Sequence, residues 1–239
     1  FATGRVVSIP KGGDPKEPNN WRPIACLNTC YKLLTGLMAA ACGPRMEEIL
    51  PSNQLALRKG VWGTTHCLAV DQAVMEDVKN DTRGKRKMHV AWIDKTKAYD
   101  TCSQQASIWA LRTAGFHPRI IQVLQRLMSQ WTVRYEVRTE KGTERSRPLK
   151  VKCGVLQGDT LSPLVFCIAI GPISTYLNAT MKGYTMRAHH PLLGNTVLTH
   201  QFYLDDLKIY ADSKEELDEA FKGVERVAGY MNLKLNPKK

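Results

Sequence analysis

Two adjacent aspartates, Asp205 and Asp206, interrupt a run of strand-forming residues. Phe202-Tyr203-Leu204 precedes them and Leu207-Lys208-Ile209-Tyr210 follows, so apolar residues flank the two carboxylates on both sides. Aromatic and β-branched residues favour strands, and two strands joined by a short polar step predict a hairpin. Two carboxylates at one turn repel each other unless a cation or solvent relieves them. The sequence therefore predicts a strand pair over 197–211 whose acidic tip is either an ordinary surface turn or a cation site.

A third carboxylate, Asp94, is placed in a similar way. It follows Val90-Ala91-Trp92-Ile93, a short apolar run that predicts a strand over 88–93. A single Asp at a strand end is usually only a cap, but three carboxylates together chelate hard cations. Two Mg²⁺ ions about 4 Å apart activate a hydroxyl and stabilise a leaving pyrophosphate, and Mn²⁺ is a substitute. Asp94, Asp205 and Asp206 are therefore candidate metal ligands for phosphoryl transfer.

The remaining patterns mix helices with strands and predict an α+β fold. Strands are expected over 1–10 and in a hairpin over 133–153 that turns at Lys141-Gly142. One helix is expected after a cap at Asn28 and is broken or kinked at Gly43-Pro44. A second helix is expected after a cap at Thr64 or Thr65, with an apolar stripe of Leu68, Val74, Met75 and Val78. Three more are expected over 103–113, from Pro118 onward and over 162–177. The last expected helix begins at a capping box formed by Ser213 and Glu216.

Charge favours a polyanionic partner. The 239 residues include 34 Lys+Arg and 22 Asp+Glu, a net charge of +12. Residues 79–97 hold seven basic and two acidic residues, and residues 131–152 hold seven and three. The net charge alone is explained equally well by solvated lysines that keep the protein soluble.

Composition limits the class of protein. With 43% hydrophobic residues the chain is able to bury a core, as one large domain or two small ones. The seven cysteines include no Cys-x-x-Cys pair, so we expect no zinc site. The most apolar stretches, 33–42 and 164–170, are shorter than the roughly 20 residues of a membrane-spanning helix. We therefore expect no membrane partner.

Five ordered motifs, which cover nearly the whole chain, resemble those of reverse transcriptases. Tyr203-Leu204-Asp205-Asp206 is similar to their Tyr/Phe-x-Asp-Asp motif, and 154–163 is similar to Gly-Val-x-Gln-Gly-x-x-Leu-Ser-Pro. Residues 94–100 resemble the first palm motif, 233–239 the last, and 9–11 with 21–24 the fingers. The resemblance is greatest to the non-LTR (LINE-type) retrotransposon branch, especially its site-specific members, and group II intron enzymes are more distant.

This resemblance implies a right-hand polymerase fold, with an antiparallel palm sheet backed by helices. Residues 1–87 are expected to be mainly fingers and 88–239 mainly palm, including the 131–153 hairpin and its connections. The thumb is expected to be absent, so that the chain is one catalytic unit and a fragment of a longer protein. The family also implies a nuclear location, while the sequence leaves the oligomeric state open.

The implied function is RNA-directed DNA polymerisation, in which a primer 3′-hydroxyl is extended with dNTPs on an RNA template. The implied partners are template RNA, a DNA primer or nicked target DNA, and dNTPs. The basic stretches within 79–97 and 131–152 would contact the nucleic-acid backbone. In this reading Asp94, Asp205 and Asp206 are the catalytic residues and the ligands of two Mg²⁺ ions.

The same resemblance implies the nucleotide-binding residues. Tyr99 would be a steric gate that excludes ribonucleotides, and Gln157 with Gly158 would lie against the incoming nucleotide. Lys11 and Arg22 would hold the triphosphate. Lys239 would be a general acid for pyrophosphate.

Two alternatives remain open. An RNA-directed RNA polymerase shares the two-metal chemistry, although Tyr99 argues against it because such enzymes keep a polar contact for the 2′-hydroxyl. A non-catalytic, RNA-binding scaffold derived from such a polymerase is the other, although its carboxylates would have no reason to be intact. The segment Gln54-Leu-Ala-Leu-Arg-Lys-Gly60 departs from the Gln-x-Gly-Phe that the family commonly has for template contact.

Overall fold

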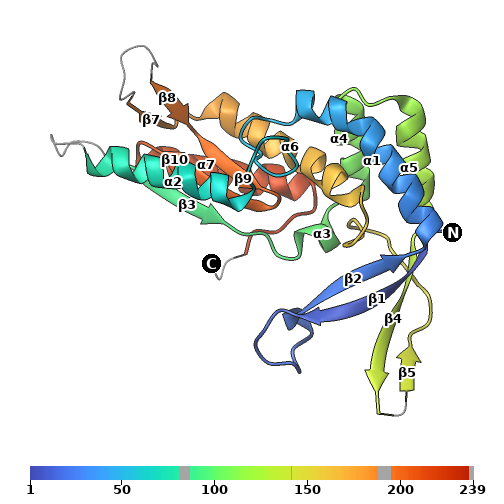
Figure 1. Cartoon of the computed structure of the whole chain (residues 1–239). Coiled ribbons are helices and arrows are strands. Elements are labelled where there is room, and N and C mark those ends of the chain that lie inside the picture. The colour runs from blue at the N-terminus through green and yellow to red at the C-terminus, as the bar shows by residue number, and fades with distance from the viewer. Residues whose placement is uncertain (81–86, 141, 188–194, 237–239) are drawn as a thin grey trace. The chain divides into compact units, whose positions relative to one another are not determined.

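A computed structural model describes residues 1–80, 87–140, 142–187 and 195–236 (Figure 1). The chain divides into two compact units: Phe1–Glu48 with Tyr99–Phe166, and Ile49–Ala98 with Cys167–Lys239. Both units combine helices and strands, which confirms the α+β class. The predicted boundary between fingers and palm at residues 87 and 88 is a functional division that these units do not test, and it stays a prediction.

The first unit contains one mixed sheet in the order β2-β1-β4-β5, with β6 also paired to β4. β1 runs parallel to β4, and the other pairs are antiparallel. The expected hairpin is confirmed, although β5 adds a pairing that the sequence did not predict. β2 was not predicted as a strand at all, because Pro23 interrupts it. The strands are β1 (Thr3–Pro10), β2 (Trp21–Leu27), β4 (Thr132–Thr139), β5 (Gly142–Arg145) and β6 (Leu149–Lys150).

Four helices and a short 3-10 helix occur mainly in this unit, around a core that includes Tyr31, Leu124 and Trp131. The indole of Trp131 donates a hydrogen bond to the Tyr31 hydroxyl at 2.8 Å, so both aromatic side chains are buried with their polar atoms paired. The helices are α1 (Thr29–Ile49), α3 (Ala98–Thr101), α4 (Gln104–Thr113), α5 (Pro118–Gln130) and the 3-10 helix Pro18–Asn20.

The helix α1 does not end where the sequence predicted a break. Asn28 caps it as expected, since its side chain accepts a hydrogen bond from the Cys30 amide at 2.8 Å. The helix then continues through Pro44 to Ile49. Cys42 and Met46, on either side of the proline, are buried and hold this part of the helix in place. Pro44 has no N–H to donate to the Ala40 carbonyl, but Ala40 is exposed, so water is able to satisfy that carbonyl.

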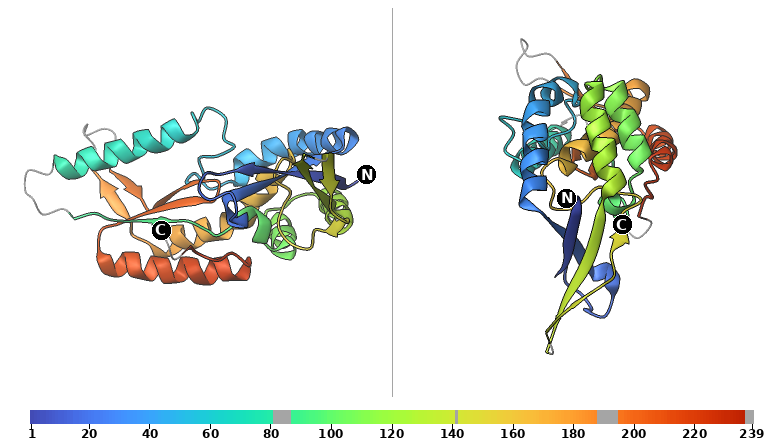
Figure 2. Two further views of the ribbon diagram at one scale, coloured as in Figure 1. Left: turned by 90° about the horizontal axis from the view of Figure 1, so that it is seen from below. Right: turned by 90° about the vertical axis from the view of Figure 1, so that its right-hand side faces the viewer.

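The second unit is built on an antiparallel sheet in the order β3-β10-β9. The helices α2 and α7 lie on opposite faces of this sheet (Figure 2). A second pair of strands, β7 and β8, packs with its neighbours around buried Val74, Tyr184 and Tyr210. The elements are α2 (Thr64–Lys79), β3 (His89–Ile93), β7 (Tyr184–Met186), β8 (Thr196–Leu198), β9 (His200–Tyr203), β10 (Asp206–Ala211) and α7 (Lys214–Tyr230).

The apolar stripe and the cap predicted for α2 are partly wrong. Gly63 occupies the N-cap position, with a φ of 58°, and no side chain caps the helix. Val74 is buried as expected, but Leu68 and Met75 are exposed. The helix instead turns Asp71 toward the sheet, where its carboxylate forms an ion pair with the ammonium of Lys208. A partly buried ionic contact of this kind cannot be predicted from apolar spacing.

The helix α6 (Ser162–Thr180) corrects the expectation about apolar length. In the described part of the chain it is the helix that is long and apolar enough to cross a membrane by length and composition alone. Within its most apolar stretch, 56% is buried inside the protein. The apolar run 164–170 ends in the sequence at Gly171-Pro172, but the helix continues through both residues to Thr180.

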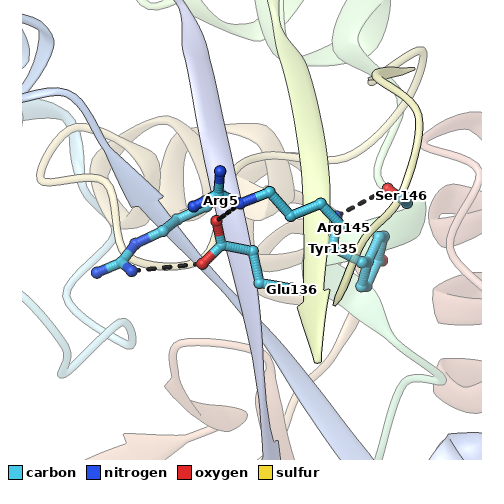
Figure 3. Close-up of polar contacts among 5 residues, drawn as sticks. All are labelled: Arg5, Tyr135, Glu136, Arg145 and Ser146. Atoms are coloured by element: carbon cyan, nitrogen blue, oxygen red, sulfur yellow. Dashed lines mark hydrogen bonds and ion pairs between the residues drawn. The ribbon is translucent and has the colours of Figure 1, made fainter. Parts of the chain in front are cut away.

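In the basic hairpin of β4 and β5, part of the positive charge is paired with a carboxylate of the same sheet (Figure 3). Glu136 accepts contacts from Arg145 at 2.8 Å and from Arg5 of β1 at 3.4 Å. On the neighbouring residue, the Tyr135 amide donates to the Ser146 hydroxyl at 3.0 Å. Several other basic residues of the hairpin are exposed: Arg134, Arg138, Arg147, Lys150 and Lys152. The second basic stretch, 79–97, lies partly outside the described residues.

Candidate active site

The second unit brings the three predicted aspartates to one end of its sheet. Tyr203 of β9 pairs with Asp206 of β10, so Leu204 and Asp205 form a two-residue turn. This confirms the predicted hairpin with an acidic tip. On the other side of β10, Leu207 pairs with Ile93, and continuing that register by one residue places Asp94 opposite Asp206. Asp206 is exposed, whereas Asp94 and Asp205 are half-buried.

A buried lysine accompanies these carboxylates. Lys95 is 3% exposed, and its ammonium donates a hydrogen bond to the backbone oxygen of Asp205 at 2.5 Å. Burial lowers the pKa of Lys95 to about 8, although the charges of Asp205, Asp206 and Asp94 act in the opposite direction. The role of the Lys95 side chain has no local signal in the sequence, because its partner lies 110 residues away along the chain.

The carboxylates also act on one another. Burial raises the pKa of the Asp205 carboxyl above its ordinary value, and the charges of Asp206 and Asp94 add to that effect. The ammonium of Lys95 opposes it. The charges at this end of the sheet therefore act on the ionisation of both Asp205 and Lys95.

The carboxylates of Asp94, Asp205 and Asp206 are chemically suited to bind a hard divalent cation, since carboxylate oxygens are the ligands that Mg²⁺ and Mn²⁺ prefer. Within residues 1–80, 87–140, 142–187 and 195–236, however, no three His, Cys, Asp or Glu side chains are gathered closely enough to hold a metal ion. Carboxylates repel each other when no cation lies between them. The metal-binding role of Asp94, Asp205 and Asp206 therefore stays a prediction.

The last described residues orient Asp94. The Asn236 side chain donates to the Asp94 carboxylate at 3.0 Å, and its backbone amide donates to the Asp94 carbonyl at 2.9 Å. Next to it, the amide of Thr96 donates to the Lys234 carbonyl at 2.9 Å. The sequence had assigned 233–239 to a palm motif without giving Asn236 a role. Lys239, the predicted general acid, lies outside the described residues.

In the first unit, the segments of Tyr99 and Gln157 contact each other. The Tyr99 ring stacks on Phe166, with ring centroids 4.4 Å apart, and the Tyr99 carbonyl accepts a hydrogen bond from Val155 at 2.8 Å. The side chain of Gln157 donates to the Asp100 carboxylate at 3.3 Å. The structure thus gathers two of the predicted nucleotide-binding residues, and their contact with a nucleotide stays a prediction.

Gly158 is required by the fold itself. Its φ is +106°, and a Cβ atom there would lie 2.8 Å from the Ala25 carbonyl oxygen of β2. The next residue, Asp159, is buried and accepts a hydrogen bond from the Thr35 hydroxyl at 2.6 Å. Burial raises the pKa of Asp159, while hydrogen bonds from Thr35 and Ser162 lower it. Asp159 anchors this loop to α1, a role that the sequence analysis missed although an Asp before a helix is a common capping signal.

Lys11 and Arg22 lie at the same end of the β1–β2 pair. Arg22 is paired with Ile9, and the amide of Lys11 donates to the Asn20 carbonyl at 2.7 Å. Lys11 directly follows the end of β1, so the two residues lie near each other along the paired strands. Both are exposed. Their predicted role in holding a triphosphate stays a prediction.

Comparison with known proteins identifies the family. Residues 9–239 match the family model described as reverse transcriptase (RNA-dependent DNA polymerase), which is nearly the entire chain. The chain belongs to the reverse transcriptase family. Enzymes of this family generally use divalent metal ions.

The curated relatives are proteins of mobile elements, which confirms the resemblance to site-specific non-LTR retrotransposons. A Pol polyprotein of the retrotransposable element R2 from Popillia japonica is 27% identical over 98% of this chain. The R2DM polyprotein of Drosophila melanogaster is 23% identical over 98%, and a 149 kDa protein of transposon TX1 from Xenopus laevis is 24% identical over 95%. The chain spans 31%, 20% and 16% of the length of these three relatives, respectively.

Solved structures show the fold. A telomerase from Candida albicans superimposes with a TM-score of 0.66 at 13% identity, and one from Candida tropicalis does so with 0.65 at 15%. Both comparisons cover 100% of this chain, and they cover 42% and 49% of the respective telomerase chains. The predicted right-hand polymerase fold is therefore confirmed.

Proposed function

We propose that this reverse transcriptase chain extends a primer 3′-hydroxyl with dNTPs on an RNA template. The observation that carries the proposal is the turn at Asp205 beside Asp206, with Asp94 on the adjoining strand of the same sheet. The R2 relatives are retrotransposon proteins, which supports retrotransposon RNA as the template. Nicked DNA as the primer and action in the nucleus belong to the same proposal and rest on the family resemblance alone.

Asp94, Asp205 and Asp206 would hold two Mg²⁺ ions, which Mn²⁺ could replace. When bound, these ions supply activation of the primer hydroxyl and neutralisation of the leaving pyrophosphate. The protein's own part is to keep the carboxylates oriented. Asn236 fixes the carboxylate of Asp94, and Lys95 offsets the repulsion among the three acids through its ammonium.

The first unit supplies the nucleotide contacts in this proposal. Arg22 and Lys11 bind the triphosphate, which suits two exposed cations at the same end of the β1–β2 pair. Tyr99 blocks a ribose 2′-hydroxyl with a ring that Phe166 holds by stacking. Gln157, Gly158 and Lys239 keep the roles that the family resemblance implies for them.

Exposed cations of the β4–β5 hairpin bind the sugar-phosphate backbone of the template and primer. Arg134 and Arg138 are exposed, whereas Arg145 is engaged by Glu136. Contacts of this kind read charge and shape rather than sequence, as a polymerase requires.

The test is primer extension on a defined RNA template with either dNTPs or rNTPs. The proposal predicts extension with dNTPs and little with rNTPs. Preferential use of rNTPs would show an RNA-directed RNA polymerase. Retained RNA binding without extension by either substrate would show a non-catalytic scaffold.

A variant pair tests the role of Tyr99 in this preference. Tyr99→Val removes the ring and is expected to raise rNTP incorporation relative to dNTP by about 10- to 200-fold, because the block to the 2′-hydroxyl is lost. Tyr99→Phe keeps the ring and its stack on Phe166, and it is expected to discriminate like the wild type. If Tyr99→Val discriminates between dNTP and rNTP as well as the wild type does, Tyr99 is not the steric gate.

A further inference from the structure

The backbone of the acidic turn is held by a buried glutamine from a distant part of the chain. The Gln54 side-chain oxygen accepts a hydrogen bond from the Leu204 amide at 3.1 Å. The Gln54 side-chain nitrogen donates to the Leu204 carbonyl at 3.2 Å. One carboxamide therefore pairs with both backbone polar groups of the residue immediately before Asp205.

The same oxygen of Gln54 also accepts a hydrogen bond from the Ala56 amide at 3.1 Å. Turning the carboxamide over would place its NH₂ group against two amide N–H donors, so these partners determine its orientation. Gln54 is 2% exposed. That burial leaves the Gln54 side chain no surface for a template contact, whereas Leu57 and Lys59 of the same segment are exposed.

Leu204 needs such support. Its φ is +52°, in the left-handed region that residues with a Cβ atom rarely adopt. In two-residue hairpin turns glycine commonly occupies a position of this kind. The two hydrogen bonds to Gln54 compensate for this unfavourable conformation and hold the turn in a single form.

Gln54 is itself fixed to the sheet. It forms a parallel bridge with Phe202 of β9, in which the Leu55 amide donates to the Phe202 carbonyl at 2.9 Å. The Phe202 amide donates to the Asn53 carbonyl at 2.8 Å, and the Asn53 side chain donates to the His200 carbonyl at 3.0 Å. The two hydrogen bonds between Gln54 and Leu204, called the clamp below, are thus anchored to the strand that leads into the turn.

We propose that Gln54 is a positioning residue for Asp205: it fixes the backbone of Leu204 and thereby the direction in which the next carboxylate projects. This inference rests on the proposed function, because positioning matters for catalysis only if Asp205 is a catalytic carboxylate. For Gln54 itself, it replaces a template contact with a role inside the catalytic hairpin.

The test compares the wild type with Gln54→Met, which has nearly the same length and shape but no hydrogen-bonding amide. Amide hydrogen exchange is expected to speed up at Leu204, while Phe202 and Leu55, whose bonds are between backbone groups, stay protected. Binding of Mn²⁺, followed by electron paramagnetic resonance, is expected to weaken about 10- to 100-fold. In primer extension, kcat per active site falls by a similar factor, while the KM for dNTP and the Kd for primer–template stay within about twofold.

Gln72→Met is the matched control, because Gln72 is exposed on α2 and its carboxamide donates to Glu76 of the same helix at 3.0 Å. It is expected to match the wild type in every measurement. A burst-phase titration of active sites separates positioning from simple loss of folded enzyme, and a kcat loss explained wholly by fewer active sites would overturn the proposal. Unchanged exchange at Leu204, or a raised Kd for primer–template with normal kcat, would also overturn it.

Failure of the proposed function has a different signature. In that case the wild type itself does not extend the primer. Hydrogen exchange at Leu204 and Mn²⁺ binding still test whether Gln54 fixes the Leu204 backbone. If both are unchanged in Gln54→Met, the clamp is wrong whatever reaction the protein performs.

Discussion

At the scale of single residues, His200 couples stability to pH. It is 1% exposed, and its ring nitrogens contact the Ser174 hydroxyl at 2.6 Å and the Thr199 hydroxyl at 2.9 Å. Burial lowers the pKa of His200 from 6.5 to about 4. The folded protein therefore resists protonation of a side chain that the unfolded chain protonates readily.

This shift predicts the direction of a pH effect. Above about pH 6.5 the imidazole is neutral in both states and contributes no pH dependence. As the pH falls from 6.5 to 4 only the unfolded state takes up the proton, so the free energy of unfolding decreases, by up to about 3 kcal/mol. Urea unfolding at pH 7 and at pH 4.5 measures the decrease. His200→Gln is expected to show a smaller decrease, and an equal decrease in both proteins would mean that His200 titrates normally when folded.

Some residues of the candidate site were predictable from sequence and others were not. Asp205 and Asp206 stand out because their apolar neighbours are adjacent in the sequence. Gln54, Lys95 and Asn236 act on partners 150, 110 and 142 residues away, respectively. Local patterns contain no signal for such pairings, since these become neighbours only after the sheet has formed.

At the scale of elements, the contact of α6 with α7 depends on a glycine. A Cβ atom at Gly223 of α7 would lie 2.1 Å from the ring of Tyr176 on α6. Gly223 is buried, whereas Gly229 of the same helix is exposed and has no neighbour within 4 Å of such an atom. The two glycines therefore form a matched pair in one helix.

Gly223→Ala is expected to lower the free energy of unfolding by about 1–2 kcal/mol, because overpacking outweighs the gain in helix propensity. Gly229→Ala gains helix propensity without overpacking, so it is expected to raise the free energy of unfolding by about 0.5–1 kcal/mol. Urea unfolding of both variants measures the difference. If Gly223→Ala stabilises the protein as much as Gly229→Ala, the two helices do not pack as closely as this contact requires.

Helix ends were predictable where the cap is local. Ser103 and Ser213 accept hydrogen bonds from the amides of Ala106 and Glu216, both at 3.2 Å, as their capping signals indicate. The side chain of Glu216 does more than the capping box suggested, because it also accepts from the Gly183 amide at 3.0 Å. The helix α1 passes Pro44 because buried side chains on both sides of it outweigh a local preference.

At the scale of the whole molecule, the predicted site residues are divided between two compact units. The three aspartates belong to the second unit, and Lys11, Arg22, Tyr99, Gln157 and Gly158 belong to the first. The family match extends through both units, from residue 9 to residue 239. The ordered motifs made the family predictable from sequence, whereas the division into units depends on contacts between segments far apart in the chain.

The central claim is that the carboxylates at the end of the β3-β10-β9 sheet carry the reaction. The most direct measurement is the rate at which one dNTP is added to a primer on an RNA template by Asp205→Ala, with Asp218→Ala on the exposed face of α7 as the control. Circular dichroism verifies that both variants are folded. We predict that Asp205→Ala lowers the rate at least about 100-fold and that Asp218→Ala leaves it unchanged. A folded Asp205→Ala variant that extends the primer at the wild-type rate would contradict the account.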